Sequence, residues 1–190
     1  MEFIEFAKIV SLSRECIITE KIDGTNGCIC IGEDGEFLVG SQTRWITPEQ
    51  DNHGFARWAY DNKDELMKLG AGRHFGEWWG SGIQRGYGLQ KGEKRFSLFN
   101  VYRWGEERPA CCNVVPTLFR GMFDTTTVQS CLDDLQKNGS YAAQGFMKPE
   151  GIIIFHTAFR RPSCGLFYPV GGFLFKKTIE KDEVPKCMQR

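Results

Sequence analysis

Residues 19–26, Thr-Glu-Lys-Ile-Asp-Gly-Thr-Asn, combine a lysine, two acids and a glycine in a pattern that suits covalent chemistry. Lys21 follows an apolar run at 16–18, which is typical of a short buried strand. Asp23 and Gly24 then form a turn signal, and we expect Gly24 to take a positive φ and bring backbone N–H groups close to a ligand. A lysine at a strand end beside a tight turn can lose hydration and act as a nucleophile. The same residues also fit a surface lysine before a hairpin, so this motif alone leaves both interpretations open.

Six segments of the chain, taken together, resemble one known family. The string Glu-Lys-Ile-Asp-Gly-Thr-Asn at 20–26 is similar to the nucleophile motif of the ATP-dependent RNA ligases, which are covalent nucleotidyltransferases together with DNA ligases and mRNA capping enzymes. Several ordered motifs at compatible spacing are a strong signal, whereas a single short motif is weak. The other matching segments follow in the family's order: 41–44, 75–80, 96–101, 149–154 and 173–177.

The resemblance implies a mechanism in which Lys21 attacks the α-phosphorus of ATP, forms a lysyl–AMP phosphoramidate and releases pyrophosphate. A free lysine amine has a pKa of about 10.4 and is protonated at neutral pH, so nearby cations and a divalent metal, Mg²⁺ or Mn²⁺, would favour the reactive neutral form. Arg44 and Lys176 are the expected cations, Glu77 is expected to serve the ribose hydroxyls, and Glu150 to lie near the metal and the reacting phosphate. The residues expected to bind ATP are Glu20, Ile22, Asp23, Gly24, Asn26, Arg44, Glu77, Phe99, Glu150, Lys176 and Lys177.

The two acids and the aromatic also have plainer interpretations. Glu77 would instead be a strand-edge acid paired with Arg73, and Glu150 a turn acid before an apolar strand. Phe99 is expected to stack on adenine from one face of a regular strand over 94–102. Because the chain holds fifteen phenylalanines, a place in the core is the alternative for Phe99.

Two segments depart from the family's pattern. Asn100 stands where the family usually has an acid, which puts any role of that charge in doubt. The family favours lysines two residues apart, but here Lys176 and Lys177 are adjacent and must point to opposite faces of a regular strand. We favour Lys176 as the contact to the α-phosphate, and a bulge in the strand would select Lys177 instead.

A glycine-rich loop at 80–88 follows the segment of Glu77. Its backbone would suit phosphates, with Arg85 pairing a phosphate of the nucleic acid and Tyr87 stacking on a base. A surface loop with no ligand explains the same residues equally well.

Composition and charge restrict the class of protein. The 190 residues are 41% hydrophobic and carry no formal net charge, which argues against a general polyanion binder. The charge is uneven, because residues 1–50 hold four basic and nine acidic side chains, and residues 151–190 hold seven basic and three acidic. The acidic N-terminus does not resemble a signal peptide, and no run reaches the roughly 18 to 20 apolar residues of a membrane span.

Eight cysteines are present without a C-x-x-C pair, so reduced and mostly buried thiols are favoured over zinc or disulfides. The expected location is a reducing cytoplasm, with a virus- or phage-encoded origin left open.

Periodicity predicts strands joined by glycine-rich turns, with two helical insertions. A helix over 55–69 is expected to stop at Gly70, and one over 126–137 to be capped by Asp124 or Thr125 and to end at Gly139. As the family's adenylyltransferase domain implies, the fold class should be α+β, with two largely antiparallel sheets that form a cleft for ATP. The predicted strands are 15–20, 27–32, 36–41, 72–79, 94–102, 111–115, 150–156 and 171–178.

The motifs span nearly the whole chain, so residues 1–190 are expected to form a single adenylylation domain without a separate C-terminal domain. Only twenty residues precede Lys21, which favours ATP over NAD as the cofactor. The expected activity is ATP-dependent joining of RNA with 5′-phosphate and 3′-hydroxyl ends, a nicked duplex included, with a partner protein as one way to replace a missing domain. The alternatives are a DNA ligase, a capping guanylyltransferase core, and a non-catalytic protein that binds nucleotides or RNA ends.

Overall fold

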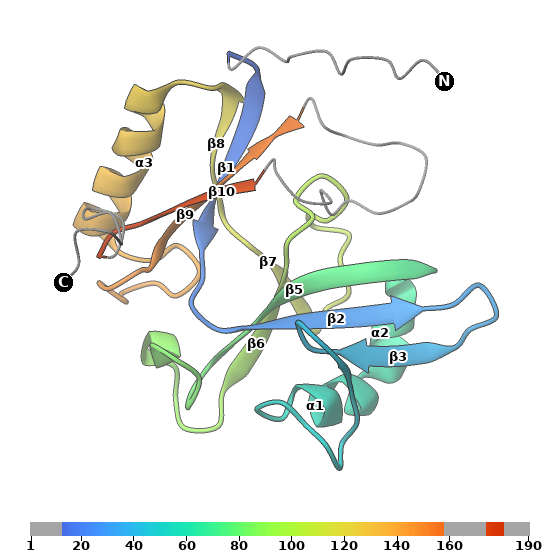
Figure 1. Cartoon of the computed structure of the whole chain (residues 1–190). Helices are drawn as coiled ribbons and strands as arrows, with labels where there is room; N and C mark the ends of the chain where they lie inside the picture. Colours follow the sequence, from blue (N-terminus) through green and yellow to red (C-terminus); the bar gives the residue numbers. More distant parts are fainter. Residues whose placement is uncertain (1–12, 158–173, 181–190) are drawn as a thin grey trace, which may run out of the picture.

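The computed structural model describes residues 13–157 and 174–180. Residues 171–173 of the last predicted strand and the basic segment 181–190 lie outside these residues. Two β-sheets with a few helices make up the described part, and its strands pair antiparallel except at one parallel pair (Figure 1). The expected α+β class with two largely antiparallel sheets is therefore confirmed.

The larger sheet carries the aromatic core. Phe55 of the first helix is fully buried, and its ring centroid lies 5.4 Å from that of Trp78 and 4.9 Å from that of Phe96. The helices on this side are α1 (Phe55–Asp61), α2 (Lys63–Leu66) and the 3₁₀ turn η1 (Met67–Leu69). In spatial order the strands are β4 (Trp45–Ile46), β3 (Phe37–Gly40), β2 (Thr25–Ile31), β5 (Gly72–Gly80), β6 (Lys94–Leu98) and β7 (Cys112–Val114).

The smaller sheet is covered on one face by a long helix, α3 (Thr125–Asn138), which lies along its outer side in Figure 1. Alternation along the strand sends Cys16 and Ile18 into the core beneath Leu132 and Leu135 of that helix. In spatial order its strands are β10 (Leu174–Thr178), β9 (Gly151–His156), β1 (Glu15–Lys21) and β8 (Thr117–Met122).

Strand β1 joins the two sheets. It lies in the middle of the smaller sheet, and residues 22–24 then lead directly into β2 in the middle of the larger one, as the blue ribbon of Figure 1 shows. Because Cys16 and Ile18 face α3, the alternating residues Ile17, Thr19 and Lys21 face the opposite way. The motif that contains Lys21 is therefore the crossing point between the sheets.

Several elements differ from those predicted. The helix expected over 55–69 is divided at Asn62, which has non-helical backbone angles (φ −107°, ψ 19°). Its side-chain amide donates to the carbonyl of Trp58 (2.8 Å), which also accepts from the backbone N–H of Asn62. The strand expected over 94–102 ends at Leu98, because the carboxamide oxygen of Asn100 accepts from the backbone N–H groups of Tyr102 and Arg103 and forms a turn.

Two strands, β4 and β8, were not predicted at all. β4 is only two residues long, and β8 alternates half-buried and exposed positions without a clear apolar face. By contrast, α3 agrees with its prediction, since the carboxylate of Asp124 accepts from the N–H of Thr126 (3.1 Å) and Gly139 follows the last turn.

The six cysteines of the described part are all free, and four of them are buried. No helix within residues 13–157 and 174–180 is long and apolar enough to cross a membrane.

Candidate active site

A cavity of about 480 Å³ lies between the two sheets, within the size range of small-molecule sites. Its walls come from β1, the 22–26 segment, β5, the turn after β6, and β9. The lining includes Lys21, Asp23, Asn26, Glu77, Phe99, Asn100, Tyr102 and Ile153. Most of the residues that the sequence singles out thus meet around one space.

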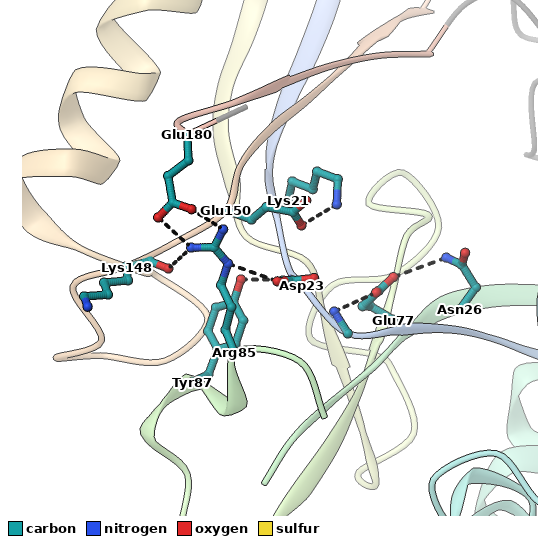
Figure 2. Close-up of polar contacts among 10 residues, drawn as sticks. Lys21, Asp23, Asn26, Glu77, Arg85, Tyr87, Lys148, Glu150 and Glu180 are labelled. Carbon is teal, nitrogen blue, oxygen red and sulfur yellow. Dashed lines mark hydrogen bonds and ion pairs between the residues drawn. The ribbon is translucent and has the colours of Figure 1, made fainter. Parts of the chain in front are cut away.

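Lys21 ends β1 at the wall of this cavity. Its ammonium group forms an ion pair with the carboxylate of Glu150, which immediately precedes β9 and is only 8% exposed (Figure 2). The pair forms because Lys21 is paired in register with Gly151, which brings two segments 129 positions apart together. Glu150 is therefore the partner of the candidate nucleophile rather than a plain turn acid.

Gly24 does not take the positive φ that the turn signal suggested. A glycine is needed there for a different reason, since a Cβ would lie 2.4 Å from the carbonyl oxygen of Trp78 and 2.8 Å from Cβ of Trp79. Its N–H donates to the carboxylate of Glu77 (3.0 Å) rather than toward an open ligand site. The backbone after Lys21 is thus packed directly against β5.

Glu77 is tied to the same segment. One of its carboxylate oxygens accepts from Gly24 and the other from the side-chain amide of Asn26 (3.2 Å), so it is not the strand-edge partner of Arg73 (Figure 2). It is 9% exposed, and burial raises its pKa to about 7, although Lys21 and the bond from Gly24 act in the opposite direction. The site therefore holds a carboxyl group that changes charge near neutral pH.

We expect Glu77 to make the stability of the fold depend on pH. Because its folded pKa of about 7 lies above the ordinary 4.5, the folded state binds the extra proton, and stability falls as pH rises between these two values. The contribution is roughly 3 kcal/mol at most, from the size of the pKa difference. The measurement is the free energy of unfolding in urea at pH 5 and at pH 7.5. The difference between these two values should be smaller for Glu77→Gln than for the original protein. An unchanged pH dependence would contradict the assignment.

Phe99 lines the cavity, although the strand that was to carry it has already ended. It leads into the Asn100 turn and packs beside a core cluster that contains Trp79 and Tyr87. The prediction that a regular strand over 94–102 carries Phe99 is therefore wrong, while Phe99 still borders the site. Asn100, at the cavity wall, uses its side-chain oxygen for the turn itself.

The two adjacent lysines of β10 lie on opposite faces of a regular strand. Lys176 pairs with Ile153, which lines the cavity, and so lies on the cavity side of the sheet. Lys177 pairs with Ile152 on the α3 side, and its ammonium group donates to Gln129 of α3 (2.9 Å). Of the two predicted phosphate contacts, Lys176 is therefore the one on the cavity side, and Lys177 lies on the α3 side.

Glu20 and Arg44 are placed differently from expectation. Glu20 is almost fully buried, and its carboxylate accepts from the hydroxyl of Ser140 and from the N–H groups of Tyr141 and Ala142. These bonds fix the segment after α3, and Glu20 also contributes to the lining of the cavity. Arg44 is exposed in the turn between β3 and β4, where Gln42, and not Arg44, lines the cavity.

The expected nucleic-acid contacts are also corrected. Tyr87 is 2% exposed and its hydroxyl accepts from the N–H of Asp23 (2.9 Å), so its ring is not available to stack on a base. Arg85 is largely covered and pairs with Asp23 and Glu180 rather than presenting a free charge (Figure 2). Neither contact could be expected from the loop's composition, because both partners are distant in the sequence.

The comparison with known families agrees with the motifs. A sequence model described as RNA ligase matches residues 14–164, which is well over half of the chain. The chain belongs to the RNA ligase family. No curated protein sequence matches it.

Solved structures of an RNA ligase from Naegleria gruberi share the fold of this family member. The structure with PPi has a TM-score of 0.61 at 17% identity and covers 87% of this chain and 50% of that chain. A mutant with AMP and Mn has a TM-score of 0.60 at 18% identity (86% and 49%), and a mutant with ATP and Mn has 0.60 at 17% (87% and 50%). The chain thus spans about half the length of the solved ligase that it resembles.

Proposed function

We propose that this RNA ligase family member activates RNA ends through a lysyl–AMP intermediate at Lys21. The observation that carries the proposal is the position of its amine, at the wall of a cavity large enough for a nucleotide and in contact with the buried carboxylate of Glu150. A protein that only binds nucleotides would not need a lysine at this position. It would also not need a carboxylate, such as that of Glu150, beside the lysine to accept its proton. The N. gruberi ligase structures with ATP and AMP favour adenine as the base of the nucleotide.

The proposed reaction begins with loss of the proton from Lys21, because only the neutral amine can attack. Glu150 contacts that amine and can accept the proton. A bond then forms between Nζ and the α-phosphorus of ATP, the bond from that phosphorus to the bridging oxygen breaks, and pyrophosphate leaves. The nitrogen then releases a second proton to solvent, which leaves the neutral phosphoramidate. Glu77 and Asn26 would face the ribose, Phe99 the base, and Lys176 the phosphates from the cavity side of β10.

A divalent cation, Mg²⁺ or Mn²⁺, fits these residues. No group of three or more His, Cys, Asp or Glu within the described ranges could hold a metal by itself. Mg²⁺ does not require one, since it commonly uses one or two carboxylates together with substrate phosphates and water. Glu150 would supply such a carboxylate, and the cation would neutralise charge on the triphosphate.

The first test of the function is covalent labelling. With Mg²⁺ and ATP labelled at the α-phosphorus, the protein should gain one AMP, and the modified peptide should contain Lys21.

Chelation of the metal should abolish labelling, because the triphosphate's charge would oppose attack and departure of pyrophosphate. In the presence of metal, labelling should increase as pH rises above neutrality, since more of the amine is neutral. Labelling by GTP and not by ATP would instead identify a capping guanylyltransferase.

The second stage tests what receives the AMP. The labelled protein, freed of ATP, should transfer AMP to the 5′-phosphate of a nicked RNA duplex and join that end to the 3′-hydroxyl. Joining should weaken as salt increases, because contacts to phosphates release counterions. A matched nicked DNA duplex is the control, and preferential joining of DNA would overturn the RNA assignment. Joining that needs an added protein would point to a partner that holds the polynucleotide.

A further inference from the structure

Arg85 makes more polar contacts within the protein than the sequence of its loop leads one to expect. It lies between β5 and the 3₁₀ turn η2 (Gly86–Gly88), and its side chain is only 18% exposed. Its Nε donates to the carboxylate of Asp23 (3.0 Å), and its two terminal nitrogens donate to the two carboxylate oxygens of Glu180 (3.2 and 3.0 Å). One of these nitrogens also donates to the backbone carbonyl of Lys148 (3.2 Å).

Each partner belongs to a different segment of the proposed active site. Asp23 is two residues after Lys21, the carbonyl of Lys148 is two residues before Glu150, and Glu180 follows β10, the strand that carries Lys176. Figure 2 shows the guanidinium at the meeting point of these segments. Arg85 itself lies in the loop that follows β5 of the larger sheet, whereas β9 and β10 belong to the smaller one.

The loop that presents Arg85 has a conformation that its own residues do not favour. Gln84 and Tyr87 both have positive φ values, 44° and 51°, a backbone conformation that is unfavourable for residues other than glycine. Such conformations persist where surrounding contacts determine them. The buried hydroxyl of Tyr87, bonded to the N–H of Asp23, is one such contact on the same segment that Arg85 holds.

We propose that Arg85 is a positioning residue, which holds the neighbouring ends of β1, β9 and β10, beside Lys21, Glu150 and Lys176, against the loop that follows β5 of the larger sheet. A guanidinium is suited to this because its planar set of donors can bind two carboxylates and a carbonyl simultaneously, which a lysine ammonium does less well. Without it, Asp23 and Glu180 would repel each other, and these strand ends would no longer be held against the loop after β5. The inference rests on the proposed lysyl–AMP function and assigns a residue outside its reacting groups.

The kinetic test uses single-turnover formation of lysyl–AMP at varied ATP. Arg85→Ala should lower the rate constant at saturating ATP at least tenfold, while the ATP concentration for half-maximal rate stays within about threefold. Arg85→Lys should recover part of the rate, and millimolar guanidinium ion should rescue Arg85→Ala but not Lys21→Ala. The control is Arg95→Ala, since Arg95 forms its ion pair with Glu93, only two residues away. An Arg85→Ala rate equal to that of Arg95→Ala would overturn the proposal.

A second measurement does not depend on catalysis. The melting temperatures of Arg85→Ala, Glu180→Ala and the double variant form a cycle, and the double variant should lose clearly less than the sum of the two single losses. Additive losses would overturn the contact on which the proposal depends. If the cycle is non-additive but the original protein forms no lysyl–AMP, the proposed function fails while the contact stands. If Arg85→Ala does not fold, Arg85→Lys and Glu180→Gln provide the same comparison.

Discussion

Replacing Lys21 by alanine is expected to reduce lysyl–AMP to less than about one-thousandth of the original amount, because the variant has no amine to form the bond to phosphorus. Lys21→Arg should fail equally. Its guanidinium can keep the ion pair with Glu150 but stays protonated and cannot attack. The measurement is transfer of label from α-labelled ATP to the intact protein, with the site located by peptide mass spectrometry.

The two Lys21 variants separate chemistry from folding. Alanine leaves the buried carboxylate of Glu150 without its partner and should lower stability, whereas arginine preserves the charge. Lys68→Ala is the matched control, since Lys68 is exposed and pairs with Glu65 three residues away. Normal labelling of a folded Lys21→Arg variant would place the nucleophile elsewhere and refute the proposed mechanism.

Gly24→Ala is expected to destabilise the fold by about 3 kcal/mol, at the upper end of the cost of overpacking. The added Cβ would meet the carbonyl oxygen of Trp78 and Cβ of Trp79, and neither atom can move as the end of a flexible side chain could. Relief of the clash must shift the segment after Lys21 and break the bond from Gly24 to Glu77. Labelling by ATP should therefore fall together with the free energy of unfolding, measured by urea denaturation.

The matched control for this substitution is Gly105→Ala. Gly105 has no positive φ, and nothing lies within 4 Å of a Cβ built there. Its replacement should change stability by no more than about 0.5 kcal/mol. If Gly24→Ala behaves like Gly105→Ala, close packing of this segment against β5 is not what requires a glycine at position 24.

Local patterns in the sequence predict those features of the fold that depend on neighbouring residues. Helix α3 agrees with its prediction because its apolar spacing and its Asp124 cap lie within one continuous segment. Strand β1 likewise follows from its apolar run. The end of strand β6 at Leu98 could not be predicted correctly, since the propensities of Phe99 and Val101 favour extension, whereas the side-chain oxygen and the backbone carbonyl of Asn100 both accept bonds that form a turn.

The sequence by itself determined the family and the residue types around the site, because ordered motifs need no coordinates to be recognised. It left open which of two adjacent lysines faces the cavity, and that choice depends on the register of β10 against β9. The ion pair of Lys21 with Glu150 and the contacts of Arg85 join positions 62 to 129 residues apart. Such pairs arise only when two sheets are assembled, so the tertiary structure alone decided that Glu20, Arg85 and Tyr87 fix segments in place, where their residue types had suggested ligand contacts.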